Sequence, residues 1–190
     1  MQLLTPGGIA LSLIILSCIK ILHEFGHAYT ATKYGLPVPH MGIAFIIMYP
    51  IFYTETTASW RIAERYKRVL IGLSGIICEL YIAAFFLLLW NITSDPGLQT
   101  ICVTVVAISL IGSLLINLNP LMRFDGYYIC SDLLGIENMQ SRSFATARWQ
   151  IRKWLFDTSE EHPEQFSTNS RKSLLLIIGL STMIYRFFLF

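Results

Sequence analysis

A short stretch near the start of the chain carries two histidines and a glutamate at a spacing that can bind a metal ion. It runs His23-Glu24-Phe25-Gly26-His27. Residues four apart share one face of a helix, so both imidazoles can bind the same zinc ion. The glutamate between them can then take a proton from a water molecule beside the metal. The pattern predicts a catalytic zinc site, with His23 and His27 as metal ligands and Glu24 as the general base.

The alternative is that these histidines are ordinary buried polar groups on an amphipathic helix. The expected helix starts at Gly8 and is almost purely apolar over its first half. Ionisable side chains inside such a helix cost free energy and are functional by default. Two histidines and a glutamate buried together need a common partner, which a divalent cation supplies. We therefore favour the metal site.

A catalytic zinc ion takes a third protein ligand and keeps one position open for water. The best candidate is Asp125, in the string Asn117-Leu-Asn-Pro120-Leu-Met-Arg-Phe-Asp125-Gly126. Pro120 interrupts helical hydrogen bonding, and we expect Gly126 to permit a tight bend after the aspartate. Broken helices at membrane depth occur where they line a wet cavity. The alternative is a helix-ending Asn-Pro turn followed by an interfacial aspartate.

The composition indicates which solvent surrounds these elements. Hydrophobic residues make up 54% and charged residues 14% of the 190 residues. Soluble domains carry about 25% charged residues, so the charges here are too few to cover a surface in water. The net charge of +2 shows no footprint for nucleic acid. We expect a multi-pass integral membrane protein in contact with the lipid bilayer.

Four apolar stretches approach the roughly twenty residues that cross a bilayer as a helix. They cover residues 8–34, 69–90, 98–118 and 174–190. After the first span, Ile, Phe, Tyr and Thr over 41–57 favour short strands, and Ser59 is expected to cap an amphipathic helix over 60–68. Basic and aromatic residues over 141–156 predict an interfacial helix, followed by a connector over 160–170.

The expected fold is therefore a mostly α membrane protein. It contains a three-helix catalytic transmembrane core, a fourth C-terminal transmembrane helix, and short membrane-associated strands between the first two helices. We divide the chain into an intramembrane protease core (1–130), a cytoplasmic or interfacial segment (131–172) and the C-terminal transmembrane helix (173–190).

The distribution of Lys and Arg predicts the orientation. Basic residues lie between spans one and two and between spans three and four, whereas the turn between spans two and three has none. The positive-inside rule places both basic segments in the cytoplasm. Spans one and three then both end on the cytoplasmic side, which brings His23, His27 and Asp125 to one depth.

Together, the two separated motifs resemble the site-2 protease family of intramembrane zinc proteases. The likeness covers about residues 8–130, and the second motif with the tyrosines behind it is most similar to the bacterial branch of peptide zinc metalloproteases. The resemblance implies one zinc ion held by His23, His27 and Asp125, with Glu24 as the base. It also implies a bacterial cell membrane as the location.

The same resemblance suggests that Asn117 helps to position the substrate and that the strands over 41–57 pair with an unwound substrate segment. One departure is in the second helix, where the family often has G-P-x-x-N and this chain has Gly72-Leu-Ser-Gly75-Ile-Ile-Cys-Glu79. Glu79 is either a local variant with a polar partner or a modulator of the site. Gly72 and Gly75 are expected to serve helix packing.

Lys20 precedes Glu24 by one helical turn. It either pairs with Glu24 or tunes the pKa of that residue, or it snorkels toward the cytoplasmic interface.

The predicted function is that of a zinc-dependent intramembrane endopeptidase that hydrolyses membrane-associated proteins or peptides, with its active site toward the cytoplasm. The alternative is a non-proteolytic zinc-binding module of a peptide export complex, with export proteins as partners. Glu24 disfavours this alternative, because structural zinc has closed coordination and needs no base. Metal transport is a weaker third hypothesis, since the polar residues gather at one depth.

Overall fold

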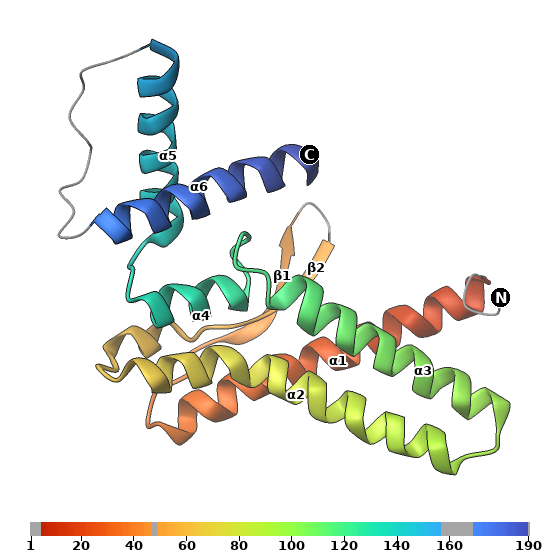
Figure 1. Ribbon diagram of the computed structural model, residues 1–190. Coiled ribbons are helices and arrows are strands. Elements are labelled where there is room, and N and C mark those ends of the chain that lie inside the picture. Colours follow the sequence, from red (N-terminus) through yellow and green to blue (C-terminus); the bar gives the residue numbers. More distant parts are fainter. Residues whose placement is uncertain (1–4, 47–48, 157–168, 190) are drawn as a thin grey trace.

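The computed structural model describes residues 5–46, 49–156 and 169–189 and shows a helical bundle with one small sheet (Figure 1). The elements in chain order are α1 (Pro6–Lys33), β1 (Met41–Ile46), β2 (Tyr49–Thr54), the 3-10 helix η2 (Thr57–Arg61), α2 (Arg65–Ile92), α3 (Pro96–Leu110), the π-helical η3 (Ile111–Asn117), α4 (Asp125–Leu134), α5 (Met139–Phe156) and α6 (Asn169–Leu189). The predicted mostly α fold is confirmed.

Within the described residues, four helices are long and apolar enough to cross a membrane. They are Pro6–Lys33, Arg65–Ile92, Pro96–Asn117 and Ser170–Leu189. Only 17–33% of the most apolar window of each is buried inside the protein, so most of these side chains face outward, where lipid can cover them. The chain is an integral membrane protein, as predicted.

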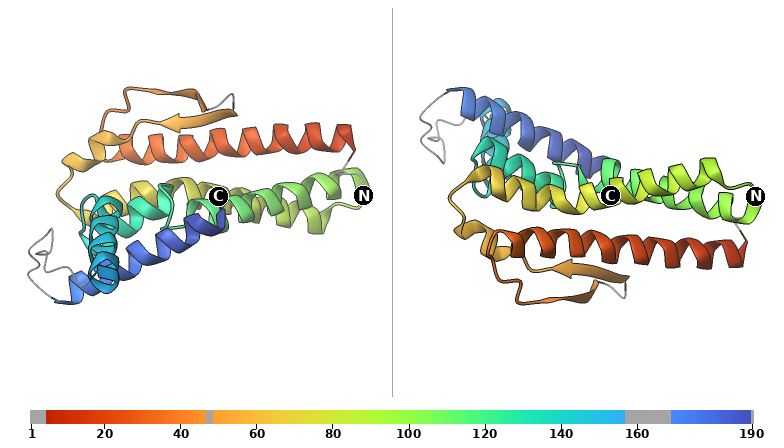
Figure 2. Two further views of the ribbon diagram at one scale, coloured as in Figure 1. Left: turned by 90° about the horizontal axis from the view of Figure 1, so that it is seen from above. Right: turned by 90° about the horizontal axis from the view of Figure 1, so that it is seen from below.

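The first three spans form one bundle. α2 contacts both α1 and α3, and α1 lies beside these two helices in both views of Figure 2. α3 begins after Asp95, whose carboxylate accepts a hydrogen bond of 2.7 Å from the Leu98 amide, as an N-cap does. The apolar core between these helices contains Ile15, Ile19 and Val105. The N-terminus of α1 and the α2–α3 turn lie at one end of the bundle, and α4 and α5 lie toward the other (Figure 1).

The two strands form an antiparallel hairpin that lies beside α1 (Figure 2). Their register pairs Met41 with Thr54 and Ile46 with Tyr49. The hydroxyl of Thr54 donates a hydrogen bond of 3.1 Å to the carbonyl of Glu24. The strands predicted over 41–57 are confirmed, and the end of β2 is held directly against the histidine motif.

The C-terminal elements form a second packed unit. α5 lies across the direction of α1, α2 and α3, and α6 crosses α5 (Figures 1 and 2). The crossing is close, because a Cβ at Gly179 would lie 2.3 Å from the carbonyl oxygen of Ser143. The core of this unit contains Tyr127, Ile136, Met139 and Leu175. The helix predicted over 141–156 is confirmed, whereas the predicted connector over 160–170 lies largely outside the described residues.

The amphipathic helix predicted over 60–68 is wrong. The structure has the short η2, and α2 begins only at Arg65. Ile62 and Glu64 between them have extended backbone angles. The carbonyl of Ile62 accepts a 2.7 Å hydrogen bond from Nη1 of Arg68, so a side chain from α2 supplies the partner that a continuing helix would have supplied.

The bend predicted at Gly126 is also wrong. Asp125 and Gly126 form the first turn of α4, which the sequence did not suggest. A Cβ at Gly126 would lie 2.3 Å from the carbonyl oxygen of Leu118. The glycine therefore serves the close approach of α4 to the end of η3, and this approach determines where Asp125 lies.

Candidate metal centre

Three predicted ligands meet in the structure. His23 and His27 are buried on the inner face of α1, and Asp125 is the first residue of α4. The Nε2 atoms of the two histidines lie 3.1 Å apart. Oδ2 of Asp125 lies 3.0 Å from Nε2 of His23 and 3.4 Å from Nε2 of His27. A metal ion could bind these three side chains together.

The three side chains fit a zinc ion in size and chemistry. Atoms bound at about 2.0–2.1 Å to tetrahedral zinc lie about 3.3 Å from one another, which agrees with the separations of 3.0, 3.1 and 3.4 Å in this structure. Oδ2 of Asp125 is buried, and among the described residues it has no hydrogen-bond partner. Both features are expected of a carboxylate and two imidazoles that share a cation.

The backbone of α2 leaves room for the imidazoles at Gly75. A Cβ on this residue would lie 2.5 Å from Nε2 of His23 and 2.6 Å from Nε2 of His27. No side chain could occupy this position without moving both rings. Gly75 was predicted to serve helix packing. The structure shows that its missing side chain makes space for the imidazole nitrogens of His23 and His27.

The charge of Asp125 also suits a metal ligand. Burial raises the pKa of its carboxyl, but the neighbouring imidazoles of His23 and His27 lower it by more. The pKa therefore lies well below its usual range, and the group stays a carboxylate at neutral pH. A ligating carboxyl group has to be deprotonated in this way.

The orientation of His27 is determined by a backbone contact. Its Nδ1 lies 2.8 Å from the carbonyl oxygen of Ile71. A carbonyl only accepts, so the proton is on Nδ1 and the lone pair of Nε2 points toward His23 and Asp125. Metal-ligating histidines usually donate their second ring nitrogen to an outer partner of this kind.

His23 has a carboxylate in the equivalent position. Its Nδ1 lies 2.8 Å from Oε1 of Glu79, which is fully buried in α2. The same carboxylate accepts a 2.6 Å hydrogen bond from Nζ of Lys20 and another from the hydroxyl of Ser113. The amide of Asn117 lies 3.4 Å from Oε1 as well.

The predicted alternatives for Glu79 were a local variant with a polar partner and a modulator of the site. The structure shows the polar partners, and one of them, His23, is a predicted metal ligand. Lys20 pairs with Glu79 and not with Glu24, so the predicted pair with Glu24 and the predicted snorkelling are both wrong. Its nitrogen points into the bundle at a buried carboxylate, which offers a stronger attraction than the membrane interface.

Ser113 was not identified from the sequence. It lies in η3, where the Leu118 amide bonds to the Ser113 carbonyl at 2.9 Å, five residues back. This widened turn presents both Ser113 and Asn117 to Glu79. Such π-helical turns are frequent at functional sites, but no pattern of residue types marks them in advance.

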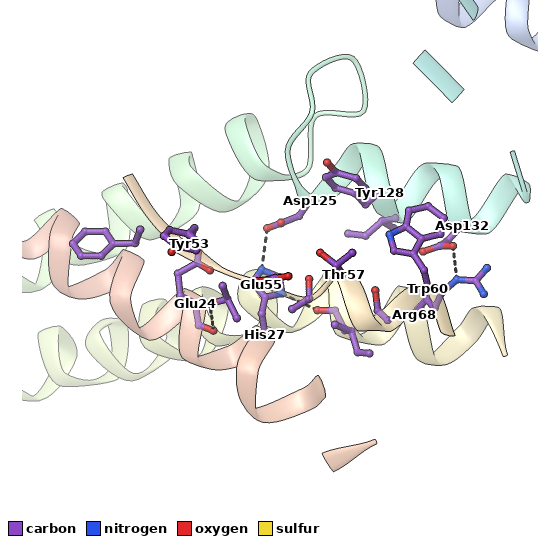
Figure 3. Close-up of a pocket in the computed structure, with 17 residues that line it drawn as sticks. Glu24, His27, Tyr53, Glu55, Thr57, Trp60, Arg68, Asp125, Tyr128 and Asp132 are labelled. Carbon is purple, nitrogen blue, oxygen red and sulfur yellow. Dashed lines mark hydrogen bonds and ion pairs between the residues drawn. The ribbon is translucent and has the colours of Figure 1, made fainter. Parts of the chain in front are cut away.

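A pocket of about 360 Å³ is lined by two of the three predicted ligands, His27 and Asp125. Figure 3 shows Glu24 and His27 from α1 on one side and Asp125 and Tyr128 from α4 on another. Residues 52–57, at the end of β2 and just beyond, complete the wall. Asn117 is not among the described residues that line this pocket, so its role in positioning a substrate stays a prediction.

The chain matches the family model of Peptidase family M50 over residues 11–105. It belongs to this family. Family M50, the site-2 protease family, consists of intramembrane zinc metalloproteases. The matched segment contains His23, Glu24 and His27 and ends before Asp125, so the geometry around Asp125 is evidence independent of the M50 match. No curated protein and no solved structure matches the chain.

Replacing Gly75 with alanine should lower zinc affinity at least about tenfold, because the new methyl group must displace both imidazoles. The measurement is competition with a chromogenic chelator on the purified protein. Gly72→Ala is the matched control, since a Cβ at Gly72 meets only the flexible Ile129 side chain, at 3.0 Å. Equal zinc affinities for the two variants would contradict the described position of the rings.

Replacing Glu79 with glutamine should lower zinc affinity about 10- to 100-fold, because the outer partner of His23 loses its charge. The absorption spectrum of the cobalt-substituted protein should shift as well, since the His23 ring is held less firmly. Glu64→Gln is the control, because Glu64 is exposed and pairs only with Lys67 among the described residues. An unchanged cobalt spectrum in Glu79→Gln would show that Glu79 does not orient His23.

Proposed function

We propose that this protein is a zinc-dependent intramembrane endopeptidase that hydrolyses peptide bonds of membrane-associated proteins or peptides. The observation that carries the proposal is the triangle of His23, His27 and Asp125 beside a pocket that Glu24 also lines. A ligand set of two imidazoles and one carboxylate leaves a position open, as catalytic zinc sites do.

His23, His27 and Asp125 would hold the zinc ion. When bound, zinc supplies a Lewis acid for the peptide carbonyl and for a water molecule. The carboxylate of Glu24 takes a proton from the attacking water and delivers it to the nitrogen of the leaving amine. Glu24 is half-buried and lines the pocket together with His27 and Asp125, so water and substrate can reach it beside the metal ligands.

The substrate would bind as an extended peptide. A helical substrate keeps its carbonyl groups in internal hydrogen bonds, so the cleaved segment has to unwind before a nucleophile reaches it. Residues 52–57 border the pocket, and the hairpin they belong to exposes large apolar side chains, including Phe45 and Tyr53. These features support pairing between the hairpin and an unwound segment. We retain Asn117 as a substrate-positioning residue in this proposal.

The remaining parts of the proposal concern location and partners. The alternation of basic segments supports a site toward the cytoplasm. The bacterial cell membrane is proposed on the resemblance of the second motif to the bacterial branch of the family. A non-proteolytic role in an export complex is less well supported, because a solvent-accessible pocket containing a carboxylate next to the metal ligands has no use in a purely structural centre.

Glu24→Gln should retain zinc and lose peptidase activity by at least about 100-fold, because the glutamine amide cannot accept the proton of water. Zinc content and cleavage of a detergent-solubilised peptide pool are measured on the same samples. Glu55→Gln is the matched control, since Glu55 lines the same pocket. Full activity in Glu24→Gln would remove Glu24 as the base, and loss of activity in Glu55→Gln alone would assign that role to Glu55.

Asp125→Ala should lose most of the bound zinc, because one of three ligand atoms is removed. Metal analysis after dialysis against a weak chelator measures this loss. Asp132→Asn is the control, because it removes another carboxylate from the same helix. Asp132 forms an ion pair of 2.6 Å with Arg68 and is not a predicted metal ligand. Normal zinc content in Asp125→Ala would mean that another group completes the metal site.

A further inference from the structure

A second pocket, separate from the metal centre, lies between the segment before α4, the start of α5 and the end of α6. Its volume is about 500 Å³. Two arginines line it, Arg123 and Arg186, together with the polar side chains of Gln140 and Ser141. None of its lining residues in the described part of the chain is acidic.

Two buried donors at this pocket have no partner among the described residues. Nε of Arg123 donates a 2.7 Å hydrogen bond to Oε1 of Gln140. Gln140 is only 6% exposed, and its Nε2 has no partner among the described residues. The Nε atom of Arg186 is likewise buried without a partner in the described structure, and its guanidinium lies over the ring of Phe144 at 5.2 Å.

The charges are also uncompensated. Arg68, by contrast, forms an ion pair of 2.6 Å with Asp132. Neither Arg123 nor Arg186 forms an ion pair within the described residues. Arg186 is partly buried, and Arg123 is exposed but bonded to the buried Gln140. Guanidinium groups held within a membrane protein normally have an anionic partner. Two of them around one pocket therefore point to an anion that comes from outside the described structure.

The donor set favours a phosphate group over a carboxylate. Two guanidinium forks, an amide and the hydroxyl of Ser141 provide more donors than the two oxygens of a carboxylate can accept, whereas a phosphate offers three or more. The pocket also has apolar walls at Met122, Phe124 and Phe144. A headgroup with the start of its acyl chains would meet both kinds of surface.

The surroundings favour a lipid as the carrier of the phosphate. α5 lies across the direction of the spans, carries basic residues, and exposes Trp154, Leu155 and Phe156 at its end. A helix of this kind lies at the level of the lipid headgroups. Basic pockets between membrane helices and such an interface bind anionic headgroups.

We propose that Arg123, Gln140 and Arg186 form a binding site for a phosphate group, carried by the headgroup of an anionic membrane lipid. Arg123 lies two residues before Asp125, so an occupied site holds the segment that leads into α4 against α5 and α6. Binding requires neither zinc nor cleavage, and its test is therefore independent of the proposed peptidase function.

The test measures thermal unfolding of the purified full chain in a nonionic detergent. Dioctanoyl phosphatidic acid should raise the unfolding temperature on the order of 5 °C at saturation. Dioctanoylglycerol, which has the same chains without the phosphate, and octanoate should not. Inorganic phosphate tests whether the site binds free phosphate. An equal shift in unfolding temperature with inorganic phosphate would confirm a phosphate site but overturn the lipid as its ligand.

Variants locate the effect. Arg186→Gln should lose the shift caused by phosphatidic acid, whereas Arg148→Gln should keep it, because Arg148 is an exposed arginine of α5 outside the pocket. Equal responses of these two variants would overturn the proposed location. If Arg186→Gln does not fold, the wild-type comparison still decides, since equal shifts with phosphatidic acid and with dioctanoylglycerol or octanoate would overturn the site.

Discussion

A carboxylate, an ammonium group and two imidazoles have to be buried together among apolar helices, and the rest of the site depends on how this is done. Removing charges from water costs several kcal/mol for each ion unless partners and hydrogen bonds replace the lost hydration. Glu79 solves the problem by accepting bonds from Lys20, His23 and Ser113 at once. These partners come from α1 and from η3, so one buried carboxylate joins all three spans of the bundle.

The same contacts prepare the histidines for a metal ion. Glu79 and the Ile71 carbonyl each occupy the Nδ1 atom of one imidazole, which turns both Nε2 atoms toward Asp125. Close approach of the helices is part of this arrangement. A Cβ at Gly26 would lie 2.8 Å from the Ser74 carbonyl oxygen, so α1 and α2 contact each other nearly backbone to backbone. The rings therefore have little freedom to turn away before metal binds.

The position of Asp125, the third predicted ligand, depends on the second half of the structure. Asp125 begins α4, and Tyr127 of that helix packs in the core formed with α5 and α6. The hydroxyl of Tyr127 also accepts a 3.1 Å hydrogen bond from the amide of Gln140. Packing around α5 thus determines where the carboxylate of Asp125 lies relative to α1, although α5 itself has no ligand. The proposed phosphate site lies on this same connection.

Local pattern was sufficient to predict the four spans, the short strands, most of α5 and the grouping of His23, His27 and Asp125. Helix periodicity, apolar length and the order of the spans are properties of neighbouring residues, so they are visible in the sequence by itself. The partner of Lys20, the space at Gly75, the π-helical turn and the first turn of α4 at Asp125 were decided only by the tertiary structure. Each depends on a contact between residues far apart in the chain, such as Lys20 and Glu79, which are 59 positions apart. Which buried charge pairs with which is a matter of distance in space, and residue types alone do not encode that distance.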